Sequence, residues 1–428
     1  MATIRENFTY SIFYQILAIG LPLITTPYVS RAIGVQGVGV YSYTYSIASY
    51  FLLFTMLGIS NHGNRSAAAA QRSKAKLGEC FVNNYLVQLA AGIFCLIAYF
   101  VYVSLFVRTY KQFALIQGLA VLSGALDINW FFGGLEKFRL TVVRNTVCKV
   151  CSVLCVFIFV HEPGDLGKYI FIMGCTMVIS QALLWAFLFK EIAFVKPEWP
   201  KVKENIKPIF MLFLPVLAYS LYRIMDKIMI GNYSGMIEVG YYENAEKVLN
   251  IPIGVITALG NVMLPRMASL SAQGDTRLQS RYIQMSMLFV SVVEGAICFG
   301  IASVANIFAP FYYGDEFVKS GRILEIIIFT ALISGWANVI RMQILIPRKR
   351  DSVYVASMLI AAVLNFGCNM LLIPQYGAMG AVFGTVLAEA VLLLVQGFAV
   401  RDAVEWRRVV GSNLPYVLAG IAMFLFVK

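Results

Sequence analysis

The sequence predicts an all-α polytopic membrane protein. Of its 428 residues, 60% are hydrophobic and only 13% are charged, whereas soluble domains carry about a quarter of charged residues. The mean hydropathy is +0.76, and the apolar residues come in repeated blocks near the roughly 20 residues that cross a bilayer as a helix. Helices are expected because lipid offers no partner to an unpaired backbone group.

The apolar blocks predict twelve membrane spans. They are expected at residues 10–30, 38–58, 84–107, 112–133, 140–160, 166–189, 209–232, 248–267, 285–308, 323–346, 353–373 and 379–400. A thirteenth apolar run, residues 414–427, is short for a span and predicts a partial thirteenth helix. The first block is too long for the apolar core of a cleavable signal peptide, so we expect it to stay in the protein.

The charges of the loops predict the orientation of these spans. With the N-terminus in the cytoplasm, the loops on that side carry 21 lysines and arginines, and the loops on the opposite side carry 6. Basic residues concentrate in cytoplasmic loops, which favours this orientation. The same distribution accounts for most of the net charge of +12, so we expect no nucleic-acid partner.

Sequence features recur between the two halves of the chain. Leu21-Pro22, Ile33-Gly34 and Gly39-Val40-Tyr41 are followed much later by Leu214-Pro215, Ile230-Gly231 and Gly240-Tyr241-Tyr242. With six spans in each half, this recurrence predicts two six-helix lobes related by a pseudo-two-fold axis along the membrane normal.

The predicted boundaries follow from the spans. Residues 1–189 form the N-terminal lobe, 190–208 a cytoplasmic linker, 209–400 the C-terminal lobe, and 401–428 an extension with the short thirteenth apolar segment. The linker is basic, and the prolines of Lys196-Pro-Glu-Trp-Pro200 prevent one continuous helix.

Several charged residues fall inside the predicted spans. Each costs at least about 2.5–3.5 kcal/mol in hydrocarbon and should face a partner or a wet cavity. Arg223, Asp226 and Lys227 follow i, i+3, i+4 spacing and share one side of the seventh span. Since cations outnumber anions in the middle of both lobes, we expect a central cavity for an anionic substrate. The predicted substrate-binding residues are Arg31, Lys149, Arg223, Asp226, Lys227 and Arg341.

Three carboxylates inside spans have two open interpretations. Asp127, Glu294 and Glu389 are candidates for coupling transport to an ion, but Glu294 and Glu389 would also fit as neutral or paired structural groups.

Other charges have structural interpretations as well. Arg223 and Asp226 would fit as a purely structural ion pair. Arg144, Glu246 and Lys247 lie close enough to span ends to snorkel towards the membrane surface.

The chain offers no catalytic motif, so we expect a transporter and not an enzyme. It has no Walker loop, no G-x-S-x-G and no H-E-x-x-H. The eight cysteines lack metal-ligand spacing and are expected to pack between helices, and the two histidines form no ligand cluster. We therefore expect neither a metal site nor a cofactor.

The segment that begins at Pro27, PYVSRAIGVQGVGVYSY, combines a cation with a glycine-rich turn. Arg31 lies at the outer end of the first span, where it could contact phosphate, form a gate between lobes, or only snorkel. Gly34, Gly37 and Gly39 allow a tight turn, and Tyr41, Tyr43 and Tyr45 cannot all share one helical face.

Motifs along nearly the whole chain resemble one family. They are Pro27-Tyr-Val-Ser-Arg-Ala-Ile-Gly34, Gly37-Val-Gly-Val-Tyr41, Trp130-Phe-Phe-Gly-Gly-Leu-Glu-Lys137 with Arg144-Asn145, Asp226-Lys-Ile-Met-Ile-Gly231, Val239-Gly-Tyr-Tyr242, Ala245-Glu-Lys-Val248, Leu264-Pro-Arg266, Tyr313-Gly-Asp-Glu-Phe317, Asn365 with Asn369, Ile373-Pro374 and Tyr376-Gly-Ala-Met-Gly-Ala381. This set is similar to the bacterial polysaccharide transporters, the Wzx-like flippases of O-antigen and capsule repeat units. These flippases belong to the multidrug/oligosaccharidyl-lipid/polysaccharide exporter superfamily.

The resemblance implies a fold, a cargo and a mechanism. The fold would be two six-helix lobes around a central cavity, with twelve or fourteen helices in all. The cargo would be an undecaprenyl-diphosphate-linked oligosaccharide, moved by alternating access from the cytoplasmic to the outer leaflet of the bacterial cytoplasmic membrane. A coupling ion, H⁺ or Na⁺, and contacts with a polysaccharide polymerase and glycosyltransferases would fit the same role.

Three other functions stay open at this point. A lipid II flippase would share the fold and a related cargo. An ion-coupled multidrug antiporter would share the fold but should rely on carboxylates and aromatic surfaces. A scaffold for glycosyltransferase and polymerase complexes would not need charges in its lumen.

Overall fold

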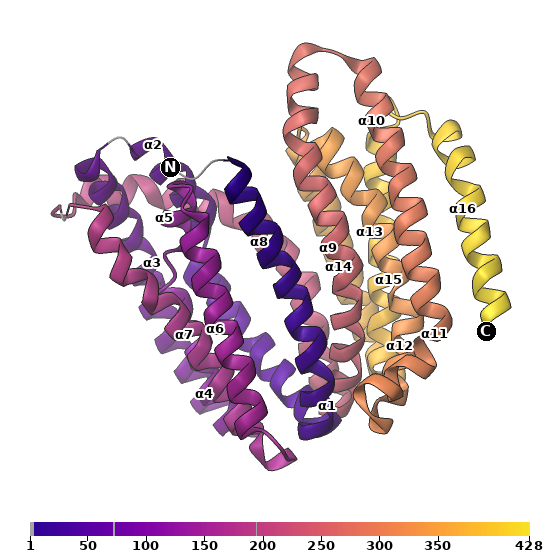
Figure 1. The fold of residues 1–428 in the computed structure, drawn as a ribbon, viewed down its shortest axis with the longest axis horizontal. Coiled ribbons are helices and arrows are strands. Elements are labelled where there is room, and N and C mark those ends of the chain that lie inside the picture. Colours follow the sequence, from indigo (N-terminus) through magenta and orange to yellow (C-terminus); the bar gives the residue numbers. More distant parts are fainter. Residues whose placement is uncertain (1–3, 72, 194) are drawn as a thin grey trace. The chain divides into compact units, whose positions relative to one another are not determined.

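The computed structural model describes residues 4–71, 73–193 and 195–428, with the backbone alone for residues 4–19, 215, 218, 219, 221 and 222. Helices make up nearly all of this part, and it contains no strand, so the all-α prediction is confirmed. The chain forms two compact units, Met1–Leu217 and Ala218–Lys428 (Figure 1). The boundary between the units falls within helix α8.

The N-terminal unit is a helical bundle. α1 packs against α3, α4 and α6, α4 packs against α7, and the short α2 packs against α5. The helices are α1 (Ile4–Met56), α2 (Ile59–Ala70), α3 (Lys74–Phe106), α4 (Lys111–Ala125), α5 (Asn129–Gly134), α6 (Phe138–Phe159), α7 (Leu166–Glu191) and the first part of α8 (Trp199–Ser234).

The C-terminal unit is also all helical. α14 and α15 form a closely packed hairpin, α12 packs against α9 and α11, and α16 packs against α11. The helices are the rest of α8, then α9 (Met236–Gln273), α10 (Thr276–Phe289), α11 (Gly295–Tyr313), α12 (Val318–Ile327), α13 (Phe329–Ile340), α14 (Asp351–Tyr376), α15 (Ala378–Ala399) and α16 (Trp406–Val427). Single π-helical turns, Val290–Glu294 and Arg341–Leu345, extend α10 into α11 and end α13.

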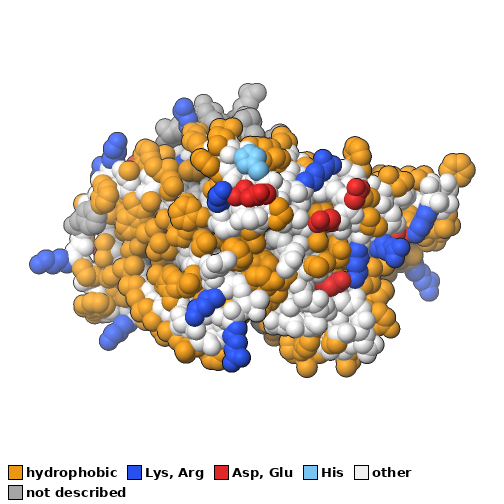
Figure 2. Space-filling view, turned by 90° about the horizontal axis from the view of Figure 1, so that it is seen from below, with side chains coloured by type: hydrophobic (Ala, Val, Ile, Leu, Met, Phe, Trp, Pro, Cys, Tyr) orange, Lys and Arg blue, Asp and Glu red, His pale blue; other side chains and the backbone are white. Residues whose placement is uncertain are grey.

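Eleven helical stretches of the described residues are long and apolar enough to cross a membrane. Large apolar side chains such as Phe94, Ile307 and Phe311 are mostly exposed on them, as expected of a surface that faces lipid. Apolar side chains also cover much of the face drawn in Figure 2, where charged side chains stand singly or in small groups. The predicted spans 10–30 and 209–232 fall on α1 and α8, where the side chains are described only in part.

The C-terminal segment is longer than the apolar run that predicted it. α16 runs from Trp406 to Val427, a 22-residue helix of about 33 Å, and it qualifies as a full membrane span. The expectation of a short segment was wrong because Arg407 and Arg408 join the helix at its first turn and are absent from the apolar run.

One glycine, not a loop, separates the first two predicted spans. α1 continues through the glycine-rich segment and breaks only at Gly34, where φ is 68° and ψ is 174°. In the second half the same conformation occurs at Gly235, with φ 87° and ψ 174°. Residues with side chains rarely adopt this conformation, so glycine is required at both places. Gly34 thus corresponds to Gly235, and the predicted match with Gly231 was wrong.

The Trp130-Phe-Phe-Gly-Gly motif forms the core of one end of the N-terminal unit. Its aromatic side chains are buried, and the Trp130 ring covers Gly63 of α2 so closely that a Cβ there would lie 2.4 Å from it. A Cβ at Gly134 would lie 2.5 Å from the Asn64 carbonyl oxygen. These glycines let α5 approach α2.

The segment before α8 is tied to α3. The Ala193 amide donates to the Lys74 carbonyl at 3.2 Å, and the Glu198 amide donates to Asn83 Oδ1 at 3.2 Å. Lys201 pairs with Glu79. α8 begins at Trp199, so part of the predicted linker is helical, and Pro200 stands in its first turn where no amide is needed.

Candidate functional site

The C-terminal unit buries a carboxylate inside a shell of hydrogen-bond donors. Asp226 of α8 is 2% exposed. Its Oδ1 accepts from Asn369 Nδ2 at 2.7 Å, and its Oδ2 accepts from the Tyr242 hydroxyl at 2.9 Å and the Thr385 hydroxyl at 2.8 Å. Asn369 also donates to Asn365 Oδ1 at 3.1 Å. We call Asp226, Tyr242, Asn365, Asn369 and Thr385 the Asp226 cluster.

Local sequence explains why the Asp226 cluster forms. Asn365 and Asn369 are one turn apart on α14, and Thr385 follows on α15 of the same hairpin. A Cβ at position 384 would lie 2.4 Å from Asn369 Oδ1. Glycine at this position therefore leaves room for the Asn369 amide. Asn369 Oδ1 itself has no hydrogen-bond partner in the described part of the chain.

A capping contact positions the α14–α15 hairpin against α9. The Glu238 carboxylate of α9 accepts the Ala378 amide at 2.9 Å at the first turn of α15 and pairs with Lys319. The preceding Gly377 has φ 61°, and a Cβ there would lie 2.6 Å from the same carboxylate. The motif at Tyr376–Ala381 therefore forms the turn between α14 and α15 and holds it against α9.

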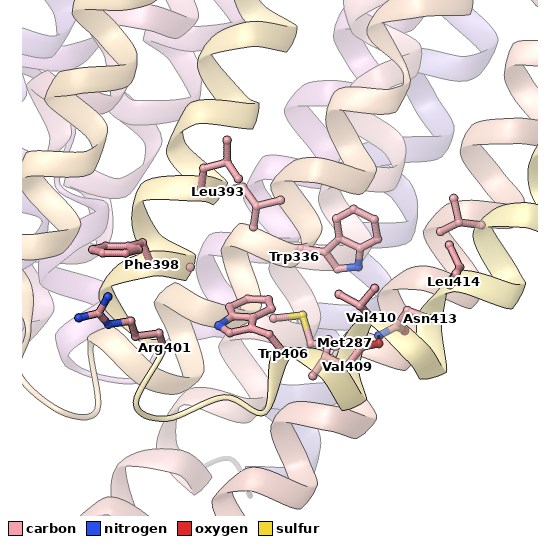
Figure 3. A pocket seen from close by; sticks show the side chains of 13 residues that line it. Met287, Trp336, Leu393, Phe398, Arg401, Trp406, Val409, Val410, Asn413 and Leu414 are labelled. Carbon is pink, nitrogen blue, oxygen red and sulfur yellow. Dashed lines mark hydrogen bonds between the residues drawn. The ribbon is translucent and has the colours of Figure 1, made fainter.

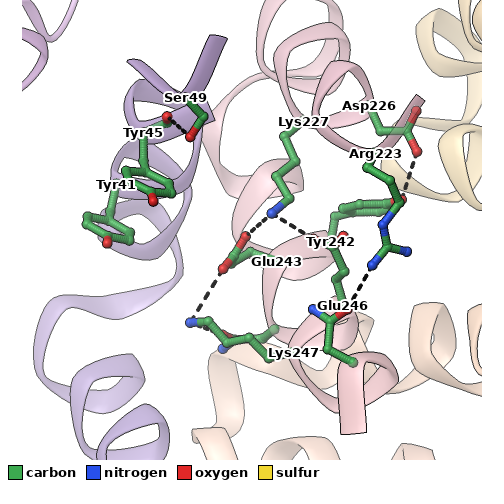
Figure 4. Close-up of polar contacts among 12 residues, drawn as sticks. Tyr41, Tyr45, Ser49, Arg223, Asp226, Lys227, Tyr242, Glu243, Glu246 and Lys247 are labelled. Atoms are coloured by element: carbon green, nitrogen blue, oxygen red, sulfur yellow. Dashed lines mark hydrogen bonds and ion pairs between the residues drawn. The ribbon is translucent and has the colours of Figure 1, made fainter. Parts of the chain in front are cut away.

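Lys227 lies in a separate, charge-balanced cluster. Its Nζ is 2.7 Å from Glu243 Oε2 and 2.6 Å from Glu246 Oε2, both on α9 (Figure 4). Lys247 Nζ lies 3.8 Å from the other oxygen of Glu243. Glu246 is 8% exposed, so the expectation that it snorkels was wrong. These two lysines and two glutamates cancel in charge, which also removes most of the cationic excess expected in this lobe.

The three charges of α8 share one side of the helix but contact different neighbours. Arg223 Nη2 donates to Asn250 Oδ1 at 2.9 Å, Asp226 lies against α14 and α15, and Lys227 faces α9 (Figure 4). Spacings of three and four residues leave angular differences of about 60° and 40° on a helix, enough to address separate neighbours.

Arg223 and Arg341 line one small polar cavity within the C-terminal unit. The cavity has a volume of about 70 Å³. Its polar lining also includes Asn338, Tyr354, Glu389 and Gln396, and its other lining residues are Ile253, Ile256, Thr257, Ser334, Ala337, Met358 and Leu392.

Two polar atoms of this cavity lack partners in the described structure. Arg341 stands in the π-helical turn, its guanidinium lies 5.7 Å from the centre of the Tyr354 ring, and its buried Nε has no hydrogen-bond partner. Gln396 donates to the Ser357 hydroxyl at 3.0 Å, but its Oε1 is unpartnered. We call this space the two-arginine cavity.

Glu294 lies in the other π-helical turn. It is fully buried, and neither carboxylate oxygen has a hydrogen-bond partner among the described residues. The turn packs against α10, α11, α13 and α16. Nearby, Trp336 donates from its indole nitrogen to the Ser291 hydroxyl at 3.0 Å.

The N-terminal unit has its own polar network at the break between α4 and α5. Asp127 Oδ1 accepts from the Asn129 amides at 2.7 and 2.8 Å, and Oδ2 accepts from Gln181 at 3.1 Å. Arg144 donates to Asn129 Oδ1 at 2.8 Å, to Asn145 Oδ1 at 2.8 Å and to the Ser180 carbonyl. Arg144 is 6% exposed, so the expectation that it snorkels was wrong.

The remaining predicted residues are in the N-terminal unit. Lys149 is half-buried on α6, and Arg31 is exposed on α1 just before the Gly34 break. The Tyr41 and Tyr45 rings stack with centroids 5.8 Å apart, one turn apart on α1 (Figure 4), and Tyr41 also contacts Tyr169. Tyr43 lies away from this pair, as the helical spacing predicts.

A second cavity in the C-terminal unit is apolar. It has a volume of about 750 Å³ between α16 and helices α10, α13 and α15 (Figure 3). Trp336, Phe398, Trp406 and Leu414 are among its lining residues, and Arg401 and Asn413 are its main polar ones. Such a lining does not suit a charged group.

The family model for polysaccharide biosynthesis proteins matches residues 4–271, which is more than half of the chain. The chain belongs to this family. A Shigella dysenteriae protein that carries the name O-antigen transporter is 22% identical over 89% of this chain and 96% of its own. A Haloferax volcanii protein named as a low-salt glycan biosynthesis flippase is 21% identical over 88% of this chain and 79% of its own.

Solved structures agree with this family in fold. An inward closed conformation of the lipid II flippase MurJ superposes with a TM-score of 0.71 over 98% of this chain and 97% of that one, at 12% identity. An inward-facing multidrug transporter of the MATE family gives a TM-score of 0.62 over 91% and 98%, at 13% identity. At such identities the likeness establishes the fold alone, and this fold agrees with the predicted two-lobe architecture.

Sequence reasoning on this polysaccharide-family chain missed the partners of its buried charges. Glu243 was overlooked because it stands between predicted spans, and it instead lies inside the long helix α9. Asn365, Asn369 and Tyr242 belong to the motifs that resemble the family, but no role was predicted for them. The one-turn spacing of the two asparagines in an apolar span was the signal that could have found them.

Removing Lys227 should destabilise the C-terminal unit. In Lys227→Gln, Glu243 and Glu246 lose the cation between them, and breaking a buried pair costs about 3–5 kcal/mol. We expect a lower melting temperature of the purified protein in detergent. Lys227→Gln with Glu246→Gln should recover part of the loss. Lys168→Gln, at a largely exposed lysine that pairs with Asp165, should change little. A Lys227→Gln protein as stable as the native one would contradict this role.

Proposed function

We propose that this protein is a flippase that moves undecaprenyl-diphosphate-linked oligosaccharide repeat units across the bacterial cytoplasmic membrane by alternating access. The observation that carries the proposal is the two-arginine cavity. Arg223 and Arg341 line one cavity, whereas the lysines of the neighbouring Lys227 cluster are paired with glutamates. The names of the curated relatives support a polysaccharide flippase of this class.

The chemistry of the two-arginine cavity suits a phosphate group. Arginine offers paired N–H donors in a fixed plane that match phosphate oxygens, and such charge-assisted bonds are about twice as strong as neutral ones. At about 70 Å³ the cavity is far below the roughly 300–1,000 Å³ of small-molecule pockets, so it would hold one phosphate group of the diphosphate and not the sugars. Lys149 and Arg31 are proposed as further contacts for the diphosphate or an acidic sugar.

We further propose Na⁺ as the coupling ion and the Asp226 cluster as its site. The cluster brings together oxygen atoms of one carboxylate, two amides and two hydroxyls, and hard cations prefer oxygen ligands. Asn369 Oδ1 is buried without a partner there and would gain one. Asp127, Glu294 and Glu389 stay predictions as coupling residues.

The two-arginine cavity also distinguishes between the alternative functions. A lipid II flippase would carry the same diphosphate and would use the same two arginines, so the two cargoes differ only in the sugar. An antiporter for cationic drugs is disfavoured, because two arginines face a single carboxylate in the cavity.

Polymer formation in cells should depend on the two arginines. A charged hydrogen bond contributes about 1.5–3 kcal/mol, so Arg223→Gln or Arg341→Gln should weaken diphosphate binding by about one to two decades. Polysaccharide should fall in a strain that lacks the native gene, while the protein accumulates normally in the membrane. Arg223→Lys should rescue poorly if bidentate geometry matters.

Arg322→Gln, an exposed arginine of α12, is the matched control and should keep activity. Full polysaccharide production by a triple variant with Arg223→Gln, Arg341→Gln and Lys149→Gln would refute the proposed site.

Transport should require sodium through Asp226. In proteoliposomes, replacing Na⁺ with choline should slow flipping at least tenfold. Asp226→Asn should be slow with either cation, because it removes the carboxylate charge that Na⁺ needs. Asp402→Asn, in a pair with Arg350 at the protein surface, should keep the sodium dependence. Equal rates in Na⁺ and choline for the native protein would rule out sodium coupling.

The proposed orientation places the N-terminus and the start of α8 in the cytoplasm. In a background without native cysteines, Lys203→Cys should resist an impermeant thiol reagent in intact cells, whereas Lys168→Cys should react because it lies on the opposite side. Both side chains are exposed to solvent or headgroups. Ready labelling at 203 with protection at 168 would invert the topology.

A further inference from the structure

Glu389 shares the two-arginine cavity. It lies on α15, is 5% exposed, and lines the same space as Arg223 from α8 and Arg341 from the π-helical turn. The three charges thus come from three different elements and meet in one cavity of about 70 Å³. No role follows for this carboxylate from phosphate binding alone, because a carboxylate repels phosphate.

The buried Glu389 carboxylate affects the two arginines of the cavity in two ways. Two guanidinium groups without an anion would be costly in the membrane interior, and a carboxylate that is held nearby lowers that cost. The same carboxylate competes for the donors that a phosphate group would use. Because it is tethered to α15, its effective concentration at the arginines is in the millimolar range or above.

The two lobes differ in what surrounds these arginines. In the N-terminal unit, Arg144 donates to four acceptors, which are the side chains of Asn129, Asn145 and Gln181 and the Ser180 carbonyl. In the C-terminal unit, Arg341 lies beside a cavity, and its Nε has no hydrogen-bond partner among the described residues. An anion that enters this cavity would meet a donor of Arg341.

We propose that Glu389 is the resident anion of the two-arginine cavity and helps to release the bound diphosphate. This inference rests on the proposed function. When the cavity is empty of substrate, the Glu389 carboxylate offsets the charge of Arg223 and Arg341. A diphosphate carries more charge than a carboxylate and displaces it from the arginines. After transfer, Glu389 returns and helps to release the headgroup.

Competition of this kind favours release. Because the Glu389 carboxylate is tethered beside the arginines, it weakens the binding of any anion that must displace it. The cost is lower affinity for the cargo, and the benefit is faster turnover.

The test measures the binding of inorganic diphosphate and inorganic phosphate to the full-length protein in nanodiscs, at one pH and ionic strength. Glu389→Gln keeps the size of the side chain and removes its charge. We expect it to bind both diphosphate and phosphate about tenfold more tightly than the native protein. Reconstituted flipping should slow, since release becomes harder. Glu325→Gln, on α12 in a pair with Lys428, is the control and should match the native protein.

Glu389→Asp covers the case in which Glu389→Gln does not fold. Its carboxylate is retracted by one methylene, so diphosphate should still bind more tightly than to the native protein. Unchanged or weaker diphosphate binding by the folded variant would overturn the resident-anion role. A different result would refute the proposed function itself. In that case Arg223→Gln and Arg341→Gln would bind diphosphate as well as the native protein does, whatever the affinity of Glu389→Gln.

Discussion

The C-terminal unit depends on the need to match every charge that its helices carry into the membrane. Asp226 shows the constraint most clearly. A carboxylate that is almost fully buried requires donors on all sides, and α9, α14 and α15 each supply one through Tyr242, Asn369 and Thr385. The three hydrogen bonds thereby tie α8 to the hairpin and to α9. Gly384 and the Gly377 junction follow from the same need, because both allow the backbone approach that the cluster requires.

The same constraint separates structural charges from candidate functional ones. Lys227 and Lys247 are balanced by Glu243 and Glu246 on α9, so they offer little to a ligand. Arg144 donates from both terminal nitrogens to acceptors of its own network in the N-terminal unit. The two-arginine cavity stands apart, because it combines an excess of one positive charge with unpartnered polar atoms. A membrane protein retains such an arrangement at a cost in stability, which argues for a role in binding.

The sequence allowed much of the fold to be predicted and less of the site. Blocks of apolar residues predicted the spans and the two-lobe architecture, because the bilayer imposes a length on every helix. The two halves were aligned on Gly231 instead of Gly235, since the pattern Ile-Gly occurs at both Gly34 and Gly231 and only the backbone angles distinguish them. Asn369 and Thr385 could not be derived as partners of Asp226, because they lie 143 and 159 residues away in the sequence. Arg223 and Arg341 were both singled out as costly charges, but their common cavity is a property of the packed helices.

The central claim is that the two-arginine cavity recognises the diphosphate of a lipid-linked oligosaccharide during flipping. The most direct measurement is transbilayer movement of a purified undecaprenyl-diphosphate-linked oligosaccharide in proteoliposomes, followed by its accessibility to a soluble glycosidase. The account predicts that the native protein exposes the substrate much faster than protein-free liposomes do, and that added inorganic diphosphate inhibits it. A variant with Arg223→Gln and Arg341→Gln should behave like the protein-free liposomes. Native rates with this double variant would contradict the claim.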